Sequence, residues 1–419
     1  MIKKIRGVRD ITGNEAKIFS YVEEIAKNTF ELYGYERIIT PIIERTELFE
    51  RGVGENTDVV EKEMYNFIDK GDRRVTLRPE GTAGVTRAYI EQGHHKSDPV
   101  QKYFYFGPMF RYEKPQKGRY RQFYHLGVET YGIDSPLIDI EILVMLIDFL
   151  NRLGLNNLTI KLNNIGCKEC RPQYLVKLKN YLKQYKQKLC TDCQRRLNKN
   201  PLRILDCKEC REKTFVKSAP KIYNNLCKGC DSFNEKLIDY LKTYNIPYEL
   251  DYSLVRGLDY YTKTVFEIYD EDIDSAQNQI VGGGRYDELV ETIGDKSQPG
   301  LGFAFGFDRL VNLIMKKNEI KVPDKYKKVF IAWYLNDENK LMKFANKLRD
   351  MDIKVDFKYK LKGFSSQLKY ADKNNYNYVI FLGENELKLK DEIHIKNMRS
   401  GKEENVKITN LKQYIDKGE

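Results

Sequence analysis

The middle of the chain alternates aromatic and polar residues in two consecutive runs. The first run begins at Lys102, and the second covers Arg121–Tyr131. A period of two is typical of half-buried strands, so the pattern predicts two strands joined by the loop Glu113–Arg119. The loop is rich in Lys and Arg, and the strands would hold Arg111 and Arg121 at its base.

Apolar residues at helical spacing occur on both sides of this hairpin. A helix is predicted over Ile18–Leu32, ending at Gly34. Another is predicted over Leu137–Leu150, with Ser135 as its cap and Pro136 in its first turn. Further strands are predicted over Tyr35–Arg45, where Pro41 suits an edge strand or a strand after a bend, and over Met64–Leu77.

A second alternation of elements follows a linker near Val322–Lys328. Three β-rich runs are separated by two helical patterns, which predicts a small α/β sheet with helices. The strands are expected over Val329–Trp333, Lys354–Phe357 and Tyr378–Leu382, and the helices over Asn339–Arg349 and Ser365–Lys373.

Length and composition predict a globular chain of two to three domains. The chain has 419 residues, of which 41% are hydrophobic. No basic start followed by an apolar run is present, so no secretory signal is expected. The most apolar run, Leu137–Leu150, contains acidic residues and is too short to cross a bilayer. The chain is therefore expected to be soluble and cytoplasmic, without a membrane partner.

The net charge of +11 comes from one segment. Lys161–Cys230 contains 18 Lys and Arg against 5 Asp and Glu, and the rest of the chain contains 54 against 56. The same segment contains all eight cysteines, in four C-x-x-C pairs: Cys167 and Cys170, Cys190 and Cys193, Cys207 and Cys210, Cys227 and Cys230.

Four C-x-x-C pairs supply the thiolates for two tetrahedral zinc sites, because two pairs complete one four-sulfur shell. Spacing does not decide which pairs join. Disulfides are disfavoured in a chain without an export signal. The alternative is that the cysteines stay reduced and pack inside a small domain.

The excess positive charge favours an anionic partner. Two four-thiolate zinc sites would each carry about −2, which leaves the segment at about +9. A lysine-rich helix precedes an arginine-rich stretch, and such clusters bind nucleic-acid backbones without reading sequence. The alternative is a solvated lysine face. The basic residues concerned are Lys177, Lys179, Lys183, Lys186, Lys188, Arg195, Arg196, Lys199 and Arg203.

Three stretches contain candidate ligand-binding groups. The guanidinium of Arg111 can hold a phosphate in two-pronged geometry, and Phe123 offers a flat face to a purine; the alternative is an exposed hairpin. In L-R-P-E-G-T, Glu80 and Thr82 can accept from an ammonium group, or Glu80 can cap the next helix. In R-G-L-D-Y-Y, Arg256 stands among hydrogen-bonding side chains, which simple sheet packing explains poorly.

Several motifs resemble those of one enzyme family. F-R-Y-E, G-R-Y-R-Q-F and G-V-E resemble motif 2 of class II aminoacyl-tRNA synthetases, specifically histidyl-tRNA synthetases. The stretch around R-G-L-D-Y-Y and the stretch G-G-G-R-Y-D-E-L resemble the two histidine-specific signatures of that family. Residues Tyr35–Arg45 resemble motif 1, a dimer contact, and Gly300–Leu310 resembles motif 3. The resemblance covers nearly the whole chain.

The resemblance implies an α+β fold. It has a class II catalytic core, built on an antiparallel sheet with helices, and a C-terminal α/β anticodon-binding domain. A small cysteine-rich domain is inserted in the core and reaches the tRNA acceptor arm. The expected parts are residues 1–155 and 247–321 for the core, 156–246 for the inserted domain, a turn and helix over Gly282–Leu289, and 326–419 for the last domain. Cysteine pairs are not general in the family, so the resemblance does not imply the zinc.

The implied function is ATP-dependent ligation of L-histidine to its tRNA through a histidyl-adenylate, by a homodimer with Mg²⁺ on the outer phosphates. Arg111, Arg256 and Arg309 would be catalytic. Histidine would be bound by Glu80, Gly81, Thr82, His125, Glu129, Arg256, Tyr260 and Tyr261. ATP would be bound by Arg111, Glu113, Arg119, Phe123 and Arg309. No P-loop or G-x-G-x-x-G is present, so side chains must hold ATP, with adenine between Phe123 and Arg309.

The resemblance also sets the role of individual groups. Glu80 and Thr82 would receive the α-amino group, and Arg256 would bridge the histidine carboxylate and the α-phosphate. Glu129 and Tyr261 would pair with the two imidazole nitrogens. His125 departs from the family, which usually has glutamine there. It could accept a hydrogen bond as glutamine does, or it could add a pH dependence.

Two other functions fit part of the sequence. A non-catalytic paralogue that senses histidine as a regulatory subunit would share the core but lack the last domain. A zinc-dependent nucleic-acid binder would use only the basic cysteine-rich segment. Amino-acid-dependent exchange of pyrophosphate into ATP distinguishes these functions from the synthetase.

Overall fold

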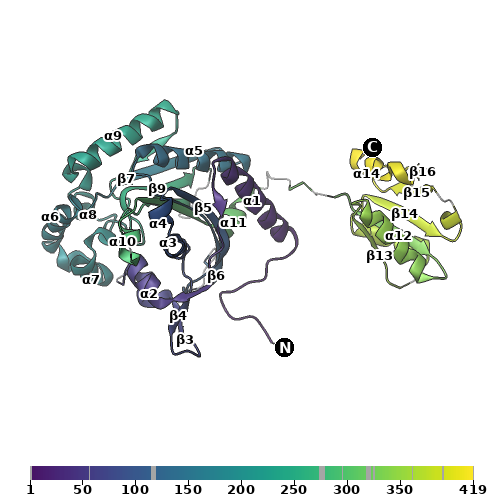
Figure 1. Ribbon diagram of the computed structural model, residues 1–419, viewed down its shortest axis with the longest axis horizontal. Coiled ribbons are helices and arrows are strands. Elements are labelled where there is room, and N and C mark those ends of the chain that lie inside the picture. Colours follow the sequence, from purple (N-terminus) through teal and green to yellow (C-terminus); the bar gives the residue numbers. More distant parts are fainter. Residues whose placement is uncertain are drawn as a thin grey trace. The chain divides into compact units, whose positions relative to one another are not determined.

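Figure 1 shows the chain as a computed structural model. The structure describes residues 2–55, 57–114, 119–272, 279–294, 296–317, 322–323, 326–360, 362–388 and 391–418. Contacts between Cα atoms divide the chain into two compact units, Met1–Lys321 and Val322–Glu419. The finer division of the first unit into core and inserted domain stays a prediction.

An eight-stranded, mainly antiparallel sheet forms the centre of the first unit. The two outermost strand pairs are parallel and the pairs between them are antiparallel. The strand order is β1 (Glu36–Arg37), β5 (Gln101–Phe110), β6 (Gln122–Tyr131), β11 (Gly300–Gly306), β10 (Gln279–Arg285), β9 (Thr262–Asp270), β7 (Leu158–Asn164) and β8 (Tyr248–Leu250).

The predicted central hairpin is confirmed. Strands β5 and β6 pair along their whole length, from Gln101 opposite Tyr131 to Phe110 opposite Gln122. The pairing continues one step further, where Arg111 N donates to Arg121 O at 2.9 Å. The middle of the connecting loop, residues 115–118, lies outside the described residues.

Three helices cover one face of the sheet: α1 (Gly13–Leu32), α5 (Pro136–Arg152) and α11 (Phe307–Lys317). Phe30 of α1 contacts Phe104 of β5 and Phe303 of β11, with ring centroids 5.8 and 6.0 Å apart. The predictions for the first two helices are confirmed: α1 gives way to Gly34 at φ +79°, and Ser135 caps α5.

Helix α3 (Thr82–Glu91) lies against the opposite face. Its Tyr89 stacks on Tyr131 of β6 with centroids 4.4 Å apart. Val128 of β6 is paired with Phe104 of the α1 side, so the alternation along β6 sends odd-numbered side chains from Phe123 to Tyr131 toward the α3 side. Short helices α2 (Thr46–Phe49), α4 (His94–Ser97) and α10 (Leu289–Ile293) complete this part.

Three predictions of local structure need correction. Met64–Leu77 is not one strand: it forms a hairpin of β3 (Tyr65–Ile68) and β4 (Arg74–Leu77), because Asp69 accepts from the Gly71 and Arg73 main chain and closes a turn. Tyr35–Arg45 forms only β1 and the short β2 (Ile43–Arg45). Strands β2, β4 and β3 make a small antiparallel sheet.

The third correction concerns Gly282–Leu289, predicted as a turn entering a helix. Its first part is instead strand β10, between β9 and β11. A Cβ atom on Gly283 would lie 2.4 Å from Gly302 O and 2.6 Å from the Phe266 ring. Glycine is therefore needed where neighbouring strands approach closely, which is a role in a strand rather than in a turn.

Residues 165–247, here called the cysteine-rich segment, connect β7 to β8. All of these residues are described, and they form helices and turns but no strand. A small core of Tyr174, Leu178 and Leu197 is buried inside them. The helices are α6 (Arg171–Lys183), α7 (Thr191–Lys199), α8 (Thr214–Lys217) and α9 (Lys228–Thr243), with short 3₁₀ turns η3 (Lys186–Lys188), η4 (Pro201–Ile204) and η5 (Ile222–Asn225).

The second unit is a mixed sheet with helices, as predicted, but it has five strands where the sequence predicted three. Ile331 packs with Leu341 of α12 on one face of the sheet, and Phe330 packs near Ala371 of α13 on the other. Its strand order is β13 (Val355–Phe357), β12 (Val329–Tyr334), β14 (Tyr378–Gly383), β15 (Glu392–Asn397) and β16 (Glu403–Lys407), and its helices are α12 (Glu338–Asp350), α13 (Phe364–Lys373) and α14 (Leu411–Lys417).

Together the two units confirm the predicted α+β fold with a C-terminal α/β unit. Within the described ranges, no helix is both long and apolar enough to span a bilayer.

Candidate active site and cysteine clusters

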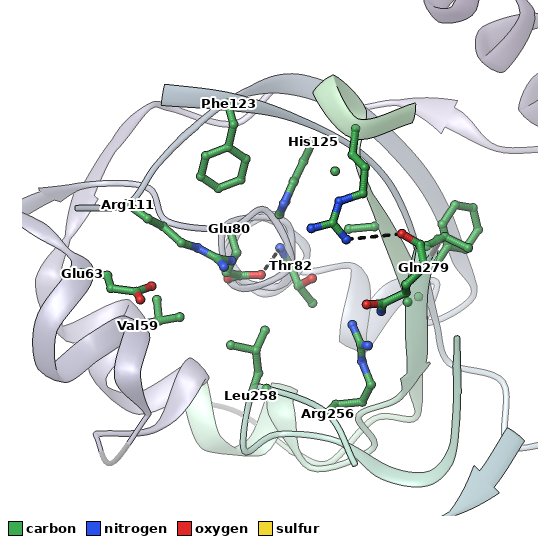
Figure 2. Close-up of a pocket in the computed structure, with 18 of the residues that line it drawn as sticks. Val59, Glu63, Glu80, Thr82, Arg111, Phe123, His125, Arg256, Leu258 and Gln279 are labelled. Atoms are coloured by element: carbon green, nitrogen blue, oxygen red, sulfur yellow. Dashed lines mark hydrogen bonds between the residues drawn. The ribbon is translucent and has the colours of Figure 1, made fainter. Parts of the chain in front are cut away.

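A cavity of about 420 Å³ lies on the α3 side of the large sheet. Figure 2 shows Arg111 and Arg256 entering it from different sides, with Phe123 and His125 above and Glu80 and Thr82 behind. Two π-helical turns stand nearby, η1 (Glu50–Gly54) and η2 (Val59–Glu63), and the second contributes to the lining.

Most of the predicted substrate-binding residues line this cavity. They come from both ends of the first unit's sequence, which only the fold brings together. The lining includes Glu80, Thr82, Arg111, Glu113, Arg119, Phe123, His125, Arg256, Tyr260, Tyr261 and Arg309. Gly81 and Glu129 are predicted residues that do not line it. Gly81 instead makes room for Tyr105, whose ring would lie 2.3 Å from an added Cβ.

Each of the three predicted catalytic arginines is anchored in a different way. Arg111 donates through Nε to Pro79 O at 2.9 Å, and its guanidinium lies 5.4 Å from the centre of the Phe123 ring. Arg309 donates through Nη1 to Gln279 O at 3.3 Å. Burial, and then the nearby charge of Arg119, lower the pKa of Arg309. Because burial disfavours the charged form of Arg309, an anionic ligand beside it would offset that effect.

Arg256 occupies space left by a glycine. A Cβ atom on Gly282 would lie 2.3 Å from the Arg256 guanidinium. The guanidinium forms an ion pair with Glu267 and lies 5.7 Å from the centre of the Tyr261 ring. The Arg256 Nε atom is buried without a hydrogen-bond partner among the described residues. A buried donor without a partner inside a cavity is suited to an acceptor on a ligand.

Glu80 caps a helix, which is one of the two roles that the sequence suggested, and it lies where the other role, binding an ammonium group, would require it. Its two oxygens accept from Thr82 N at 2.7 Å and from Ala83 N at 2.9 Å, so it caps the first turn of α3. The same carboxyl lines the cavity. Burial raises the pKa of Glu80, and a cationic ligand beside it would offset that effect.

Glu129 lies behind the cavity wall. Its carboxyl accepts from Thr82 Oγ1 at 2.7 Å and from the Tyr286 hydroxyl. Burial raises the pKa of Glu129 to about 8. Gly302 makes room for this carboxyl, since an added Cβ would lie 2.1 Å from Glu129 Oε2. Its direct pairing with a substrate imidazole stays a prediction.

His125 is a neutral group in this site. Burial, followed by the charges of Arg111 and Arg78, lowers the pKa of His125 to about 3. Its Nδ1 atom is buried without a hydrogen-bond partner among the described residues. Of the two alternatives left open by the sequence, this favours a hydrogen-bonding group over a source of pH dependence near neutrality.

Sequence reasoning missed several groups at the cavity. Tyr105 and Tyr286 line it. Tyr105 stands in an aromatic run that is equally typical of a core, and Tyr286 lies inside the motif G-G-G-R-Y-D-E-L, which was not assigned residue by residue. Asp308 lines it while accepting from Arg9 Nη2 at 2.6 Å and from Tyr124 N at 2.7 Å. The G-V-R-D start of the chain, which contains Arg9, was the available signal. Arg203 from the cysteine-rich segment also lines the cavity.

The eight cysteines form two clusters. The outer cluster joins the first and last pairs, Cys167, Cys170, Cys227 and Cys230, and the inner cluster joins the middle pairs, Cys190, Cys193, Cys207 and Cys210. All eight are free thiols. Sulfur–sulfur distances of 3.7 to 3.9 Å recur in the outer cluster, and one of 3.7 Å is found in the inner cluster.

These distances match a tetrahedral metal site. Sulfurs at about 2.3 Å from a zinc ion are separated by about 3.8 Å, whereas a disulfide would bring them to about 2.05 Å. The four sulfurs of each cluster lie within 4.8 Å of one another. The residues present therefore fit zinc, and the nested pairing is something that spacing alone could not provide.

The basic residues of the cysteine-rich segment fall into two groups. Lys177, Lys183 and Lys186 are exposed. In contrast, Arg196 pairs with Asp58 at 2.9 Å, and Arg195 and Lys199 pair with Glu61 at 3.5 and 3.3 Å. The arginine-rich part of the predicted nucleic-acid surface is thus occupied by contacts within the chain.

Comparison with known proteins agrees with the geometry. A family model described as "Histidyl-tRNA synthetase" matches residues 7–196 and 213–310, and one described as "Anticodon binding domain" matches residues 328–418. The chain is 45% identical to a histidine–tRNA ligase of Halothermothrix orenii over 418 residues, covering 99% of both chains. It is 47% identical to that of Dictyoglomus thermophilum over 414 residues, covering 97% of both.

Solved structures give the same result. The crystal structure of apo Staphylococcus aureus histidyl-tRNA synthetase superposes with a TM-score of 0.82 at 34% identity, covering 99% of this chain and 100% of the other. A Bacillus halodurans structure, described as an ATP phosphoribosyltransferase regulatory subunit/histidyl-tRNA synthetase, reaches a TM-score of 0.64 at 21% identity over 91% of this chain and 98% of the other, a likeness of fold alone.

Proposed function

The chain belongs to the histidyl-tRNA synthetase family, and on that premise we propose that its arginine-lined cavity performs both steps of histidine ligation. The chain is an enzyme that joins L-histidine to its cognate tRNA with ATP as a substrate. It is not the regulatory paralogue, because ligase relatives match it over 99% of its length and it contains the C-terminal unit.

The observation that carries the proposal is the shared cavity of Arg111, Arg256 and Arg309. Guanidinium groups bind phosphate and carboxylate in fixed geometry, and a cavity with three of them suits a triphosphate beside an amino acid. Acceptors for an ammonium group, Glu80 and Thr82, line the same cavity. The site thus offers complementary charge to both ends of the reacting pair.

In the first step, the histidine carboxylate attacks the α-phosphorus of ATP and pyrophosphate leaves. Glu80 and Thr82 would hold the α-ammonium group, and Arg256 would bridge the histidine carboxylate and the α-phosphate. Arg111 and Arg256 would oppose the negative charge that grows on the phosphoryl oxygens. Adenine would lie between Phe123 and Arg309. The protein supplies no covalent nucleophile, so its contribution is to orient the reactants and stabilise charge.

Mg²⁺ fits the acidic side of the cavity. Glu63 and Glu113 both line it, and burial, followed by the charge of Glu113, raises the pKa of Glu63. Two neighbouring carboxylates of this kind are typical Mg²⁺ ligands when phosphates supply the rest. We propose that they hold the ion, which when bound would neutralise charge on the outer phosphates. Arg119, paired with Glu113 at 3.2 Å, would orient that carboxyl.

Selectivity for histidine would come from fixed polar groups around the imidazole ring. Tyr261 would accept or donate on one ring nitrogen. Glu129, whose carboxyl accepts from Thr82 and Tyr286, would bind the other ring nitrogen through the space between Thr82 and Tyr286. A site with such partners rejects side chains that cannot satisfy them. Neutral His125 would take the place of the amide that the family usually has.

In the second step, the terminal ribose hydroxyl of tRNA attacks the adenylate. We propose that the exposed lysines of α6 and η3 in the cysteine-rich segment contact the acceptor arm through its phosphates. The C-terminal unit, which matches the anticodon-binding family model, would bind the anticodon stem. The domain boundaries expected from the sequence, with an inserted domain at 156–246, belong to this proposal.

Each cysteine cluster would hold one structural Zn²⁺ ion. Eight buried or half-buried thiols at tetrahedral spacing support this. We also propose a cytoplasmic homodimer. Ile39, Ile42 and Ile43 are exposed around β2, in the stretch that resembles motif 1, and an apolar patch of this kind is typical of an interface.

Histidine-dependent exchange of labelled pyrophosphate into ATP, without tRNA, tests the proposal. We expect exchange with histidine and none above background with the other amino acids, followed by charging of tRNA when it is added. Absence of exchange with histidine would contradict the proposal. Exchange without charging would restrict it to the first step.

A further inference from the structure

One wall of the cavity is a stretch without regular structure. Residues 255–261, here called the Arg256 segment, form neither helix nor strand, yet Arg256, Tyr260 and Tyr261 all line the cavity. Main-chain groups outside helices and sheets are not paired by a regular ladder, so bonds to side chains, to other main chain or to water must satisfy them. The partners of this segment therefore decide how its side chains are presented.

The cysteine-rich segment supplies one of these partners through Arg203. Arg203 lies in η4, between the two halves of the inner cysteine cluster. Its Nη1 atom donates to the main-chain oxygen of Arg256 at 3.1 Å and forms an ion pair with Asp206. A charged donor therefore holds the peptide unit that carries the proposed catalytic guanidinium.

Two further residues of the cysteine-rich segment contact the Arg256 segment, which is also held by a bond from Asp259 N to Val53 O at 3.2 Å. Asn200 Nδ2 donates to Asp259 Oδ1 at 2.6 Å. Arg171, which directly follows Cys170 of the outer cluster, donates through Nη2 to the main-chain oxygen of Tyr261. The three contacts are distributed along the segment, at its start, middle and end, so together they limit both its position and its rotation.

Helix α7, which ends directly before Asn200, also contacts the neighbouring part of the wall. Arg196 of α7 pairs with Asp58 at 2.9 Å, and Lys199 pairs with Glu61 at 3.3 Å. Asp58 and the η2 residues Val59 and Glu63 line the cavity together with the Arg256 segment. Helix α7 and turn η4 thus bridge two stretches of the cavity wall that are distant in sequence.

We propose that the cysteine-rich segment is a positioning element for amino-acid activation, with Arg203, Asn200 and Arg171 as its positioning residues. It sets the geometry of the Arg256 segment, and the first step therefore depends on it even without tRNA. This inference rests on the proposed function of the cavity. It adds a role within the active site to a segment whose charge alone suggests only contact with nucleic acid.

Measurement of pyrophosphate exchange without tRNA tests the inference. In Arg203→Met the side chain keeps its length but loses the donor, and we expect KM for histidine to rise by about tenfold. In Asn200→Ala we expect a rise of about threefold, because a neutral donor is lost. KM does not depend on the fraction of folded enzyme, so a merely structural role of these residues would lower thermal stability and leave KM unchanged.

Arg203→Lys is the conservative variant and should recover most of the affinity, since a charged donor remains. Lys236→Ala, on the exposed face of α9 in the same segment, is the matched control and should keep KM within twofold. If Arg203→Met does not fold, Asn200→Ala decides the question. The inference would be overturned if KM for histidine in Asn200→Ala stayed within twofold of the wild-type value. It would also be overturned if KM rose equally in Lys236→Ala.

Exchange by the wild-type chain distinguishes a failure of the proposed function from a failure of the positioning role. If it shows no histidine-dependent exchange, the proposed function fails. If it exchanges normally and the Arg203 and Asn200 variants keep its KM, only the positioning role fails.

Discussion

Two walls of one cavity are built on different physical principles. The sheet wall consists of groups on or beside strands β5, β6, β10 and β11, such as Arg111 and His125, and the strand ladder fixes them. The loop wall consists of the Arg256 segment and residues 58–63, which lack strand pairing. It is held by side chains of the cysteine-rich segment. The loop wall is therefore the part of the site that distant changes can displace.

The supports of the two walls also differ. The sheet wall rests on a large core in which Val128, Phe303 and Phe305 are almost fully buried. The cysteine-rich segment has helices of 4 to 16 residues, no strand and a small core. Segments of this size usually need a metal or cross-link to keep one conformation. Arg171 directly follows Cys170 of the outer cluster, and Arg203 lies between the two cysteine pairs of the inner cluster. Metal ions bound at the two clusters would therefore fix the chain close to both arginines.

The largest effect is expected from the loop wall's own arginine. Arg256→Ala should slow histidine-dependent pyrophosphate exchange by at least about 10²-fold, as removal of a single oxyanion-stabilising donor does. The variant leaves the half-buried Glu267 without its ion-pair partner, which costs stability. Arg256→Met combined with Glu267→Gln removes that cost and serves as the control. It should regain the melting temperature but not the exchange rate; recovery of both would remove Arg256 from catalysis.

A smaller effect is expected from the support of the loop wall. Cys193→Ser should reduce the zinc content, measured by a colorimetric chelator after denaturation, from two ions to one per chain. The cysteine pairs of the inner cluster stand on both sides of η4, which contains Arg203. Loss of the metal should therefore weaken the contact between Arg203 and the Arg256 main chain, and exchange should fall by about tenfold through a higher KM for histidine. Groups of the sheet wall do not depend on this cluster. Full zinc content or unchanged KM in the variant would break the distinction between the two walls.

Within the sheet wall, Glu129→Gln should raise KM for histidine by roughly tenfold, since the proposed partner of the imidazole is altered.

Burial raises the pKa of Glu129 to about 8, above its ordinary 4.5. The folded chain therefore binds an extra proton between these values, and its stability falls as pH rises through that range. The melting temperature of the wild type relative to Glu129→Gln should decrease from pH 5 to pH 9. A melting-temperature difference that stays constant from pH 5 to pH 9 would contradict the raised pKa of Glu129.

The smallest effect is expected for His125→Gln. Because burial and neighbouring arginines lower the pKa of His125 to about 3, the residue stays neutral through the working range. The variant should keep KM for histidine within about threefold and leave the pH profile of exchange between pH 6 and 9 unchanged. Loss of a titration step in this range on substitution would show that His125 carries charge after all.

The two regions also differ in how far their sequence predicts them. Strand alternation predicted the β5–β6 hairpin, and cysteine spacing predicted two four-thiol sites. Spacing could not choose the pairing, because that depends on where α6 and α9 lie in space. The short turn closed by Asp69 was hidden inside a run of apparent strand.

At the cavity, sequence motifs identified the arginines but not the second layer around them. The position of Glu129 behind Thr82 depends on Gly302, which allows the carboxyl to lie against β11. The glycines of β10 were misread as a turn because their function is to admit Arg256 and Phe266. Arg203 was read as part of a basic surface, since no local pattern places it beside the Arg256 main chain.

The most direct test of the central claim is a crystal structure with a non-hydrolysable histidyl-adenylate analogue. The account predicts that Arg111 and Arg256 contact its phosphoryl group at about 2.7–2.9 Å, with adenine between Phe123 and Arg309 and the imidazole near Tyr261. An analogue bound elsewhere, or bound in this cavity with either arginine directed away from the phosphoryl group, would contradict it.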